Sequence, residues 1–253
     1  MARYFLDNGV LIGLTFLHDA WRDEAERVFD TGNSLFVNEA VIYDYCNRTR
    51  ENSLEEADID WDTEEGVFGK KLSPIRAAQF NLDLKMESLT DDELDLETLV
   101  DSFLEESQVE KKTDEDLIEE YIRPRIRDFL EDEIDGRSIT SEVASEVMET
   151  LCDTIQTQAR EKREVIRSRV RKKEVSEEKW QQYTGQLGFV DGHVDTVILS
   201  SVAWLSNIDF LHRIVSSDES DMYNDRDRIR ASVGITVVYI KDKFAKPPEN
   251  ALG

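Results

Sequence analysis

Strand-like segments occur only near the two ends of this 253-residue sequence, and that distribution restricts the folds open to it. The apolar run at residues 4–6 stops at Asp7, and a second run at residues 35–37 stops at Asn38. A helix over residues 19–30 is predicted between them, because its apolar side chains recur at helical spacing. Asn38 can cap the helix that follows the second run. The first fifty residues therefore read as strand, helix, strand, helix.

The last seventy residues repeat this alternation. A helical pattern covers residues 194–205, and the strand-like residues 213–217 end at Asp218. A charged helix then leads to Gly234, and a final strand is predicted over residues 235–240. Alternating strands and helices predict an α/β fold whose central parallel sheet is covered by helices on both faces.

The middle of the chain, residues 51–183, has almost no strand signal. Between residues 87 and 120 there are 15 acidic residues against two lysines, about half of the net charge. Apolar stripes nevertheless predict three helices, over residues 96–104, over residues 117–130 with a kink at Pro124, and from residue 141 toward 173.

The simplest organisation is one α/β core interrupted by a large, mainly helical insertion. Residues 1–50 and 184–245 form the core, because a fragment that ended at residue 50 could not close a hydrophobic core of its own. Residues 51–183 form the acidic helical insertion, and residues 246–253 form a tail. In an open parallel sheet, ligands bind at the carboxyl ends of the strands. Asp7 and Asp218 are both expected there.

The charge balance indicates a particular environment. The chain carries 56 acidic and 31 basic residues, a net charge of −25, and has 12 Lys against 19 Arg. Strong self-repulsion of this kind is tolerated where salt screens it, and the composition resembles that of proteins from salt-loving archaea. An acidic regulatory protein from an ordinary cell is the alternative. Without a long apolar span or a leader, we expect a soluble, cytoplasmic protein and no membrane partner.

Several kinds of site are excluded by the residues present. Cys46 and Cys152 lack the CxxC spacing of zinc sites and redox motifs, and the three histidines form no HExxH motif. The sequence also lacks a GxxxxGK[ST] phosphate loop. Any metal ion is therefore expected to be held by oxygen ligands.

Four aspartates fall at positions where a crevice of the core could gather them. Asp7 and Asp218 end predicted strands, Asp44 lies within the second helix, and Asp195 begins a later one. Carboxylates at close range repel each other, so a stable cluster needs a cation or shared protons. Mg²⁺ and Mn²⁺ suit such oxygen ligands. With 56 acidic residues in the chain, helix capping alone is the competing explanation.

The segments around these acids resemble the PIN domain family of nucleases, which includes the toxins of toxin–antitoxin pairs. The resemblance lies in YFLDNGVLIG, VNEAVIYDYCNR, VDTVILSSVA and RIVSSD. It implies a PIN-like three-layer fold and a ribonuclease that depends on Mg²⁺ or Mn²⁺. It also implies roles for individual residues: Asp7, Asp195 and Asp218 as metal ligands, Asp44 as a ligand or a general base acting through water, and Ser216 as a hydrogen-bond partner.

The sequence departs from the family pattern in three places. The family usually has Glu where Asp44 stands, Asn8 replaces a small hydroxyl residue, and Gly9 stands where Asn is common. The insertion is also larger than toxin members carry. Two acids compete with the assigned ones, namely Glu39 and Asp191, and Asp221 could assist Asp218.

A basic segment answers part of the objection that so acidic a protein would repel RNA. Residues 160–173 carry a net charge of +6, and a helix there would place Arg163, Arg167 and Arg171 on one face, where they could bind phosphates. Alternatively, this helix pairs with the acidic helices of the insertion or docks an acidic partner. Trp180 and Tyr183 either stack on bases or pack where the insertion rejoins the core.

The leading hypothesis is thus an endoribonuclease with RNA as its substrate, and with an antitoxin, another protein or a second copy of the chain as further partners. The main rival is an interaction protein without catalytic activity, which the departures at Asp44 and Gly9 favour. A nuclease acting on DNA is a third reading, because the catalytic chemistry does not choose between the sugars.

Overall fold

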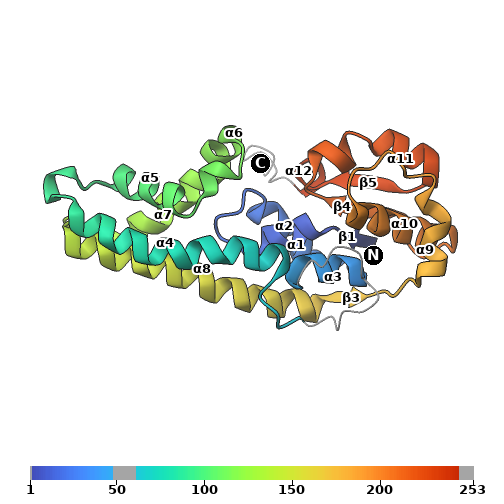
Figure 1. Ribbon diagram of the computed structural model, residues 1–253, viewed down its shortest axis with the longest axis horizontal. Helices are drawn as coiled ribbons and strands as arrows, with labels where there is room; N and C mark the ends of the chain where they lie inside the picture. The colour runs from blue at the N-terminus through green and yellow to red at the C-terminus, as the bar shows by residue number, and fades with distance from the viewer. Residues whose placement is uncertain (1, 48–60, 245–253) are drawn as a thin grey trace, which may run out of the picture. The chain divides into compact units, whose positions relative to one another are not determined.

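The computed structural model describes residues 2–47 and 61–244 of the chain (Figure 1). The predicted tail, residues 246–253, lies outside the described residues. The chain divides into two compact units, each treated separately below. Unit 1 comprises Met1–Leu14, Asp23–Phe68 and Glu164–Gly253, and unit 2 comprises Thr15–Arg22 and Gly69–Arg163.

Unit 1 contains a five-stranded parallel sheet with the strand order β3-β2-β1-β4-β5. This confirms the predicted α/β class with a central parallel sheet flanked by helices. Its strands are β1 (Arg3–Leu6), β2 (Ser34–Val37), β3 (Val170–Lys172), β4 (Arg213–Ser216) and β5 (Thr236–Tyr239).

The central strand β1 is apolar because helices cover the sheet on both faces. Phe5 is fully buried, and it lies in register with Phe36 on β2 and Ile214 on β4. A strand buried on both faces reads as a continuous apolar run rather than as an alternating pattern. The run at residues 4–6 was therefore a sound predictor of the middle of the sheet.

One strand of the sheet lies within residues 51–183, where the sequence has almost no strand signal. β3 lies within that range and pairs with β2, with Val170 opposite Leu35 and Lys172 opposite Val37. Of its three residues only Val170 is buried. A short, basic edge strand has no apolar alternation to reveal it, and its pairing with β2 depends on contacts far apart in the sequence.

In unit 1, α3 and α10 begin where the sequence predicts, α2 begins three residues later than predicted, and α1, α9 and α12 were not predicted. Asn38 caps α3, because its side-chain oxygen accepts a hydrogen bond of 3.1 Å from the backbone N–H of Val41. The helix predicted over residues 194–205 is α10. The bounds are α1 (Asn8–Thr15), α2 (Arg22–Asp30), α3 (Glu39–Cys46), α9 (Glu177–Thr184), α10 (His193–Asn207), α11 (Arg226–Val233) and α12 (Ile240–Phe244).

Unit 2 is helical, and its two longest helices are antiparallel neighbours. Gln79 on α4 donates a hydrogen bond of 3.0 Å to Asp153 on α8, and the hydroxyl of Ser141 donates one of 2.8 Å to the carbonyl of Met86. The bounds of its helices, some of which continue into unit 1, are α4 (Gly66–Ser88), α5 (Leu96–Glu106), α6 (Glu115–Leu117), α7 (Arg123–Ile134) and α8 (Ser141–Arg169).

The predicted helix over residues 117–130 is divided in the structure. A π-helical turn at Ile118–Ile122 separates α6 from α7, and Pro124 lies in the first turn of α7. A proline costs little there, because the first backbone N–H groups of a helix have no partner within it. Pro124 thus lies at the start of a helix rather than at a kink within one.

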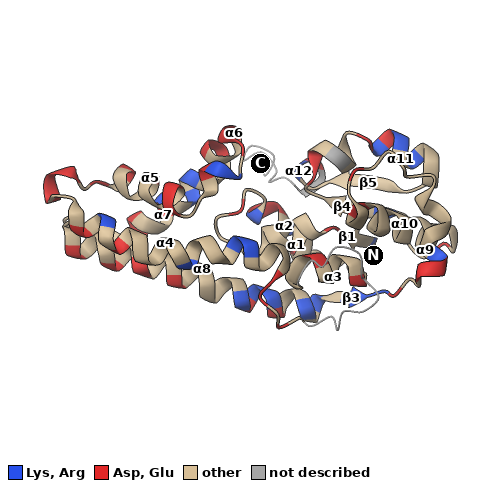
Figure 2. Ribbon diagram, viewed as in Figure 1, with Lys and Arg blue, Asp and Glu red and all other residues tan. Residues whose placement is uncertain are grey.

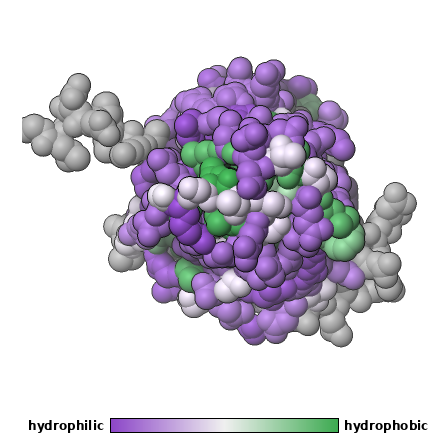
Figure 3. Space-filling view, turned by 90° about the vertical axis from the view of Figure 1, so that its left-hand side faces the viewer, coloured by the Kyte–Doolittle hydropathy of each residue, from purple (hydrophilic) through white to green (hydrophobic). Residues whose placement is uncertain are grey.

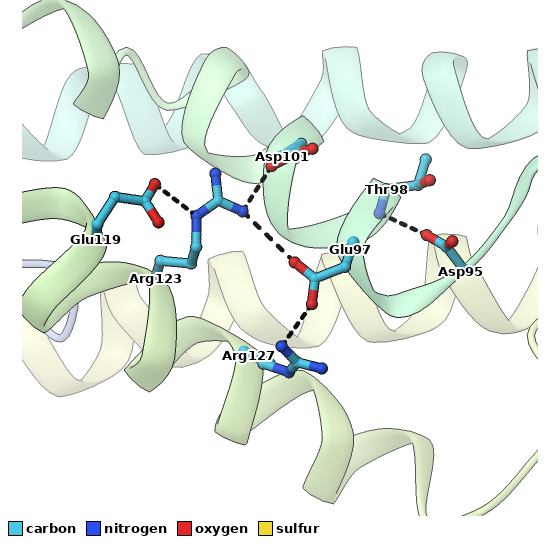
Figure 4. Close-up of polar contacts among 7 residues, drawn as sticks. All are labelled: Asp95, Glu97, Thr98, Asp101, Glu119, Arg123 and Arg127. Carbon is cyan, nitrogen blue, oxygen red and sulfur yellow. Dashed lines mark hydrogen bonds and ion pairs between the residues drawn. The ribbon is translucent and has the colours of Figure 1, made fainter. Parts of the chain in front are cut away.

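The charges of the acidic helices are partly neutralised by arginines of α7 (Figure 4). Arg123 forms ion pairs of 2.7 Å with Asp101 and 2.8 Å with Glu119, and Arg127 forms one of 2.7 Å with Glu97. Exposed pairs of this kind contribute about 0–1 kcal/mol each. The packing of α5 against α7 therefore depends mainly on their buried apolar stripes.

In the parts of the chain that the structure describes, no helix combines the length and the apolar character that crossing a membrane requires.

Candidate active site

The carboxyl edge of the sheet brings together acids that are far apart in the sequence. Asp7 directly follows β1, and its backbone N–H donates a hydrogen bond of 3.0 Å to the carbonyl of Val215 on the neighbouring strand β4. Ser216 ends β4, and Asp218 follows two residues later. Because parallel strands all end at the same edge, this arrangement places both acids at one side of the sheet.

Asp7 is buried and held by two hydrogen bonds. The hydroxyl of Ser216 donates to Oδ2 at 2.8 Å, and the backbone N–H of Asn8 donates to Oδ1 at 2.7 Å. The same hydroxyl accepts a hydrogen bond of 3.0 Å from the backbone N–H of Asp218. Ser216 therefore fixes the Asp7 carboxylate and ties it to the loop that carries Asp218, consistent with its predicted role as a hydrogen-bond partner.

Burial raises the pKa of Asp7 to about 6, because removal from water disfavours the charged carboxylate. The hydrogen bonds from Ser216 and Asn8 lower this pKa, whereas the charges of Asp218 and Asp44 raise it further. Asp218 and Asp44 are thus each close enough to Asp7 to disfavour its charged form. Near neutral pH such a group is stabilised by a cation or by a retained proton.

Asn8 stands between two of these acids. Its side-chain nitrogen donates a hydrogen bond of 2.5 Å to Oδ2 of Asp44 on α3. Its side-chain oxygen is buried and has no hydrogen-bond partner among the described residues. A buried acceptor left without a partner costs about 1–3 kcal/mol, so this oxygen is a position where a bound cation or water would stabilise the protein.

Asp195 lies in the first turn of α10 and is half-buried. A Cβ built on Gly192, whose φ is +90°, would lie 3.0 Å from Oδ2 of Asp195, so this carboxylate approaches the loop that precedes its helix. The charges that act most strongly on the pKa of Asp7 are those of Asp218 and Asp44. The structure thus places Asp44 and Asp218 where their charges act on Asp7, and it places Asp195 at the start of α10, as predicted.

The donor set suits a hard divalent cation, although the side chains do not surround a common point. Carboxylate and amide oxygens are the ligands that Mg²⁺ and Mn²⁺ prefer. Within residues 2–47 and 61–244, however, no group of three or more Asp, Glu, His or Cys side chains is arranged to hold a metal ion. The residues thus fit such an ion by chemistry, and the half-buried Asp44 and Asp218 would have to turn toward it.

The structure describes two of the three further acids, Glu39 and Asp191. Glu39 forms an ion pair of 2.7 Å with Lys172, which accounts for its charge at the start of α3. Asp191 is exposed in the loop before α10. The side chain of Asp221 lies outside what the structure describes.

Gly9 is explained by a close approach that the sequence does not reveal. A Cβ at this position would lie 2.1 Å from Oγ of Ser217, on the loop after β4. Any larger residue at position 9 would require Ser217 to move. The glycine, which departs from the family pattern, therefore leaves room for Ser217, the residue next to Ser216.

The predicted arginine face was wrong. α8 ends at Arg169, and Arg171 lies in β3, where it is in register with Phe36. Arg163 is buried with 7% of its surface exposed, whereas Arg167 is exposed and lies 3.3 Å from Asp62. Basic residues still gather near the end of α8 and on β3 (Figure 2). The sequence could not predict where α8 ends, because the run of basic residues continues from the helix into β3 without a break.

Trp180 lies within unit 1 near the ends of the strands. Its ring lies edge-on to that of His193, with 6.5 Å between the ring centres, and it lines a cavity of about 50 Å³ with Asn38 and Ser201. Asn38 also donates a hydrogen bond of 3.0 Å to Ser201 on α10. This link between the start of α3 and α10 was not predicted, since a capping asparagine gives no sign of its second partner.

Comparisons of the chain with protein-family models, curated proteins and solved structures found no match.

Proposed function

We propose that the chain is a PIN-like nuclease that hydrolyses RNA phosphodiester bonds with the help of Mg²⁺ or Mn²⁺. The observation that carries the proposal is the buried Asp7 at the carboxyl edge of the sheet, with a pKa raised to about 6 by burial, Asp218 and Asp44. Three carboxylates and the buried amide oxygen of Asn8, which has no hydrogen-bond partner in the part of the chain that the structure describes, form a negative, oxygen-rich group. A divalent cation is the simplest ligand that would stabilise it.

The proposed roles follow from the contacts of each side chain. Asp7, Asp44 and Asp218 would hold the cation, and Asp195 joins them on the strength of the family resemblance alone. Ser216 is a positioning residue, because its hydroxyl fixes Oδ2 of Asp7 at 2.8 Å. A divalent cation at such a site lowers the pKa of bound water and stabilises the charge that develops on phosphoryl oxygens.

The negative charge of the protein affects how RNA can approach the site and which assay conditions are needed. Unscreened carboxylates repel a phosphate, so RNA reaches this edge only when cations neutralise the acids. The net charge of −25 extends the same argument to the whole molecule and supports the proposed origin in a salt-rich cytoplasm. Assays therefore belong in concentrated KCl with a divalent cation present.

The test is cleavage of labelled single-stranded RNA with Mn²⁺ by the natural protein and three variants. We expect Asp7→Asn to lower the cleavage rate at least a hundredfold and Ser216→Ala to lower it about tenfold. Asp132→Asn, an exposed acid of α7, should leave the rate unchanged. Equal rates for the natural protein and Asp7→Asn would reject the site. A DNA strand of the same sequence distinguishes the two nuclease readings.

A second candidate function is an interaction protein without catalysis. The observation that favours it is the hydrogen bond by which Asn8 already engages Oδ2 of Asp44, together with the lack of three ligating side chains around one point among the described residues. Absence of cleavage by the natural protein, under conditions where it binds partner proteins but no Mn²⁺, would support this reading.

A further inference from the structure

A hollow lined by Asn38 lies on the same edge of the sheet as the proposed metal site. β1 and β2 are parallel, with Phe5 opposite Phe36. Asp7 and Asn38 each lie two positions further along the chain, so they are neighbours at the carboxyl edge, on strands about 4.8 Å apart. The hollow is therefore next to the carboxylate at the centre of the proposed site.

The lining of the hollow combines polar and apolar side chains. Its volume is about 50 Å³, and most of its lining comes from α3, α9 and α10. Asn38 and Ser201 are its polar, uncharged members, and both are buried. The apolar members are Ala40, Val175, Trp180 and Val197. A small apolar hollow with a few convergent polar groups suits a ring that carries hydrogen-bonding groups along one edge.

The charge of the lining favours an uncharged occupant. Among the described residues that line the hollow, Glu39 is the charged one, and its carboxylate pairs with Lys172 at 2.7 Å. A phosphate placed here would meet a carboxylate and no basic side chain of the lining. A nucleobase carries no charge at neutral pH and meets no such repulsion.

Trp180 gives the hollow a fixed aromatic wall. Its ring is half-buried and meets the ring of His193 at an angle of 74°. The face of unit 2 shown in Figure 3, by contrast, is mostly hydrophilic, with smaller apolar areas. Proteins that bind single-stranded RNA stack its bases on aromatic rings and hydrogen-bond their edges, and the hollow offers both kinds of contact.

Asn38 can bind the edge of a base and keep its structural contacts. Its Oδ1 accepts a hydrogen bond of 3.1 Å from the backbone N–H of Val41, and its Nδ2 donates one of 3.0 Å to Oγ of Ser201. An amide nitrogen has two N–H groups, and an amide oxygen accepts two hydrogen bonds. The second donor and the second acceptor position of Asn38 match the adjacent donor and acceptor on the edge of uracil or cytosine.

We propose that this hollow, here called the Asn38 pocket (Asn38, Trp180 and Ser201), binds a pyrimidine base of the RNA, next to the phosphate that is cleaved. The inference rests on the proposed nuclease function and adds a substrate preference to it. A volume of about 50 Å³ admits the edge of a single ring, whose face lies against Trp180. The fused rings of a purine would hold the sugar and its phosphate further from Asp7, so a pyrimidine fits better.

The first test is the binding of nucleosides, followed by nuclear magnetic resonance in concentrated KCl with EDTA. Uridine and adenosine carry no phosphate, and EDTA removes divalent cations, so the result is independent of the metal site and of cleavage. We expect uridine to bind more tightly than adenosine and to shift the side-chain amide signals of Asn38. Trp180→Leu should raise the dissociation constant for uridine about tenfold, whereas Trp180→Phe, which keeps an aromatic ring, should change it little.

Two further variants separate the pocket from general effects on the fold. Trp204→Leu is the matched control, because Trp204 is also half-buried, and Nζ of Lys179 lies 4.6 Å from the centre of its ring. Uridine binding should be unchanged in this variant. Asn38→Ser keeps a residue that can cap α3 and removes the amide, so it should weaken uridine binding as Trp180→Leu does. Each variant should keep the circular dichroism spectrum of the natural protein.

The second test is the position of the cuts that the protein makes in single-stranded RNA with Mn²⁺. The natural protein should cut mainly beside uridine and cytidine, and Trp180→Leu should lose this preference while it keeps Mn²⁺ binding. If the natural protein binds uridine through Trp180 but cleaves no RNA, the pocket is supported and the nuclease function is rejected. No binding of uridine, equal binding of adenosine, or binding that Trp180→Leu leaves unchanged would overturn the pocket, whether or not RNA is cleaved.

Discussion

Asp7 shows how a single residue links stability and chemistry. Its carboxylate is buried, accepts two hydrogen bonds and faces the charges of Asp218 and Asp44. Ionising a buried carboxylate beside two other negative charges destabilises the fold. Such a destabilising group is kept where its ionised form has a function. The residues beside it support the same interpretation, since Ser216 fixes the carboxylate and the buried oxygen of Asn8 has no partner among the residues that the structure describes. We therefore interpret Asp7 as the centre of the proposed site.

The raised pKa of Asp7 predicts a measurable pH effect. The folded pKa of about 6 lies above the ordinary value of 3.8, so the folded state binds the proton more tightly than the unfolded state does. This contribution to stability is complete below pH 3.8, declines as the pH rises, and is lost above pH 6. Without a divalent cation, Asp7→Asn should therefore raise the free energy of unfolding at pH 7.5 by about 1–3 kcal/mol.

Denaturant unfolding of both proteins in EDTA at pH 7.5 and at pH 4 provides the measurement. The stabilisation should be present at pH 7.5 and nearly absent at pH 4, where Asp7 keeps its proton. A variant that is less stable than the natural protein at pH 7.5 would contradict the assigned burial and charge effects.

Among the helices and strands, the sequence predicted those whose apolar residues all pack into the core. β1 is buried on both faces and reads as a plain apolar run, and α10 carries one apolar stripe toward the core. α4 was not predicted, because Phe80 and Leu84 on its outer face blur the periodicity of the inner face. β3 was missed because its pairing with β2 alone makes it a strand. Elements defined by distant contacts leave little trace in the local sequence.

Helix α1 lies close to the loop after β4, and this close approach gives a prediction about Gly9. In an open helix, Gly→Ala stabilises by about 1 kcal/mol, because alanine restricts the unfolded chain. Here the added Cβ would lie 2.1 Å from Oγ of Ser217, so Gly9→Ala should destabilise instead, by about 1–2 kcal/mol.

Ser217→Ala removes the clashing oxygen, and in that background Gly9→Ala should become neutral or stabilising. Thermal unfolding of the two single variants and the double variant measures the coupling between the positions. Additive effects would mean that the close approach of α1 to this loop is wrong.

For the whole molecule, the sequence predicted a parallel sheet interrupted by helices. It also predicted four acids at one site, and for three of them, Asp7, Asp44 and Asp218, the structure shows mutual electrostatic effects centred on Asp7. The grouping followed from strand ends, which are local features, combined with the rule that parallel strands end at one edge. The arginine face could not be predicted in the same way. It depended on where α8 ends, and the pairing of β3 with β2 determines that end.

Two of the three predicted arginines are exposed, and they lead to a prediction about RNA binding. Arg167 and Arg171 are both exposed in unit 1, whereas Arg163 is buried and unsuited to contact phosphates. In the Asp7→Asn background, which prevents cleavage, replacing Arg167 and Arg171 with Gln should raise the dissociation constant for RNA about tenfold. The slope of log affinity against log salt should become shallower by about one to two. Fluorescence anisotropy measures both quantities.

Arg137→Gln is the matched control, because Arg137 is an exposed arginine of unit 2 that pairs with Glu146. Equal losses in the control and in the double variant would assign the effect to net charge. An unchanged affinity in the double variant would exclude a role for this surface in holding RNA.

The most direct measurement is Mn²⁺ binding, followed by electron paramagnetic resonance of the free ion in concentrated KCl, where weak binding to surface acids is suppressed. The account predicts a saturable site in the natural protein that Asp7→Asn loses and Asp132→Asn keeps. Identical binding by all three proteins, or no binding by any of them, would contradict the claim that the carboxylates at this sheet edge hold a divalent cation.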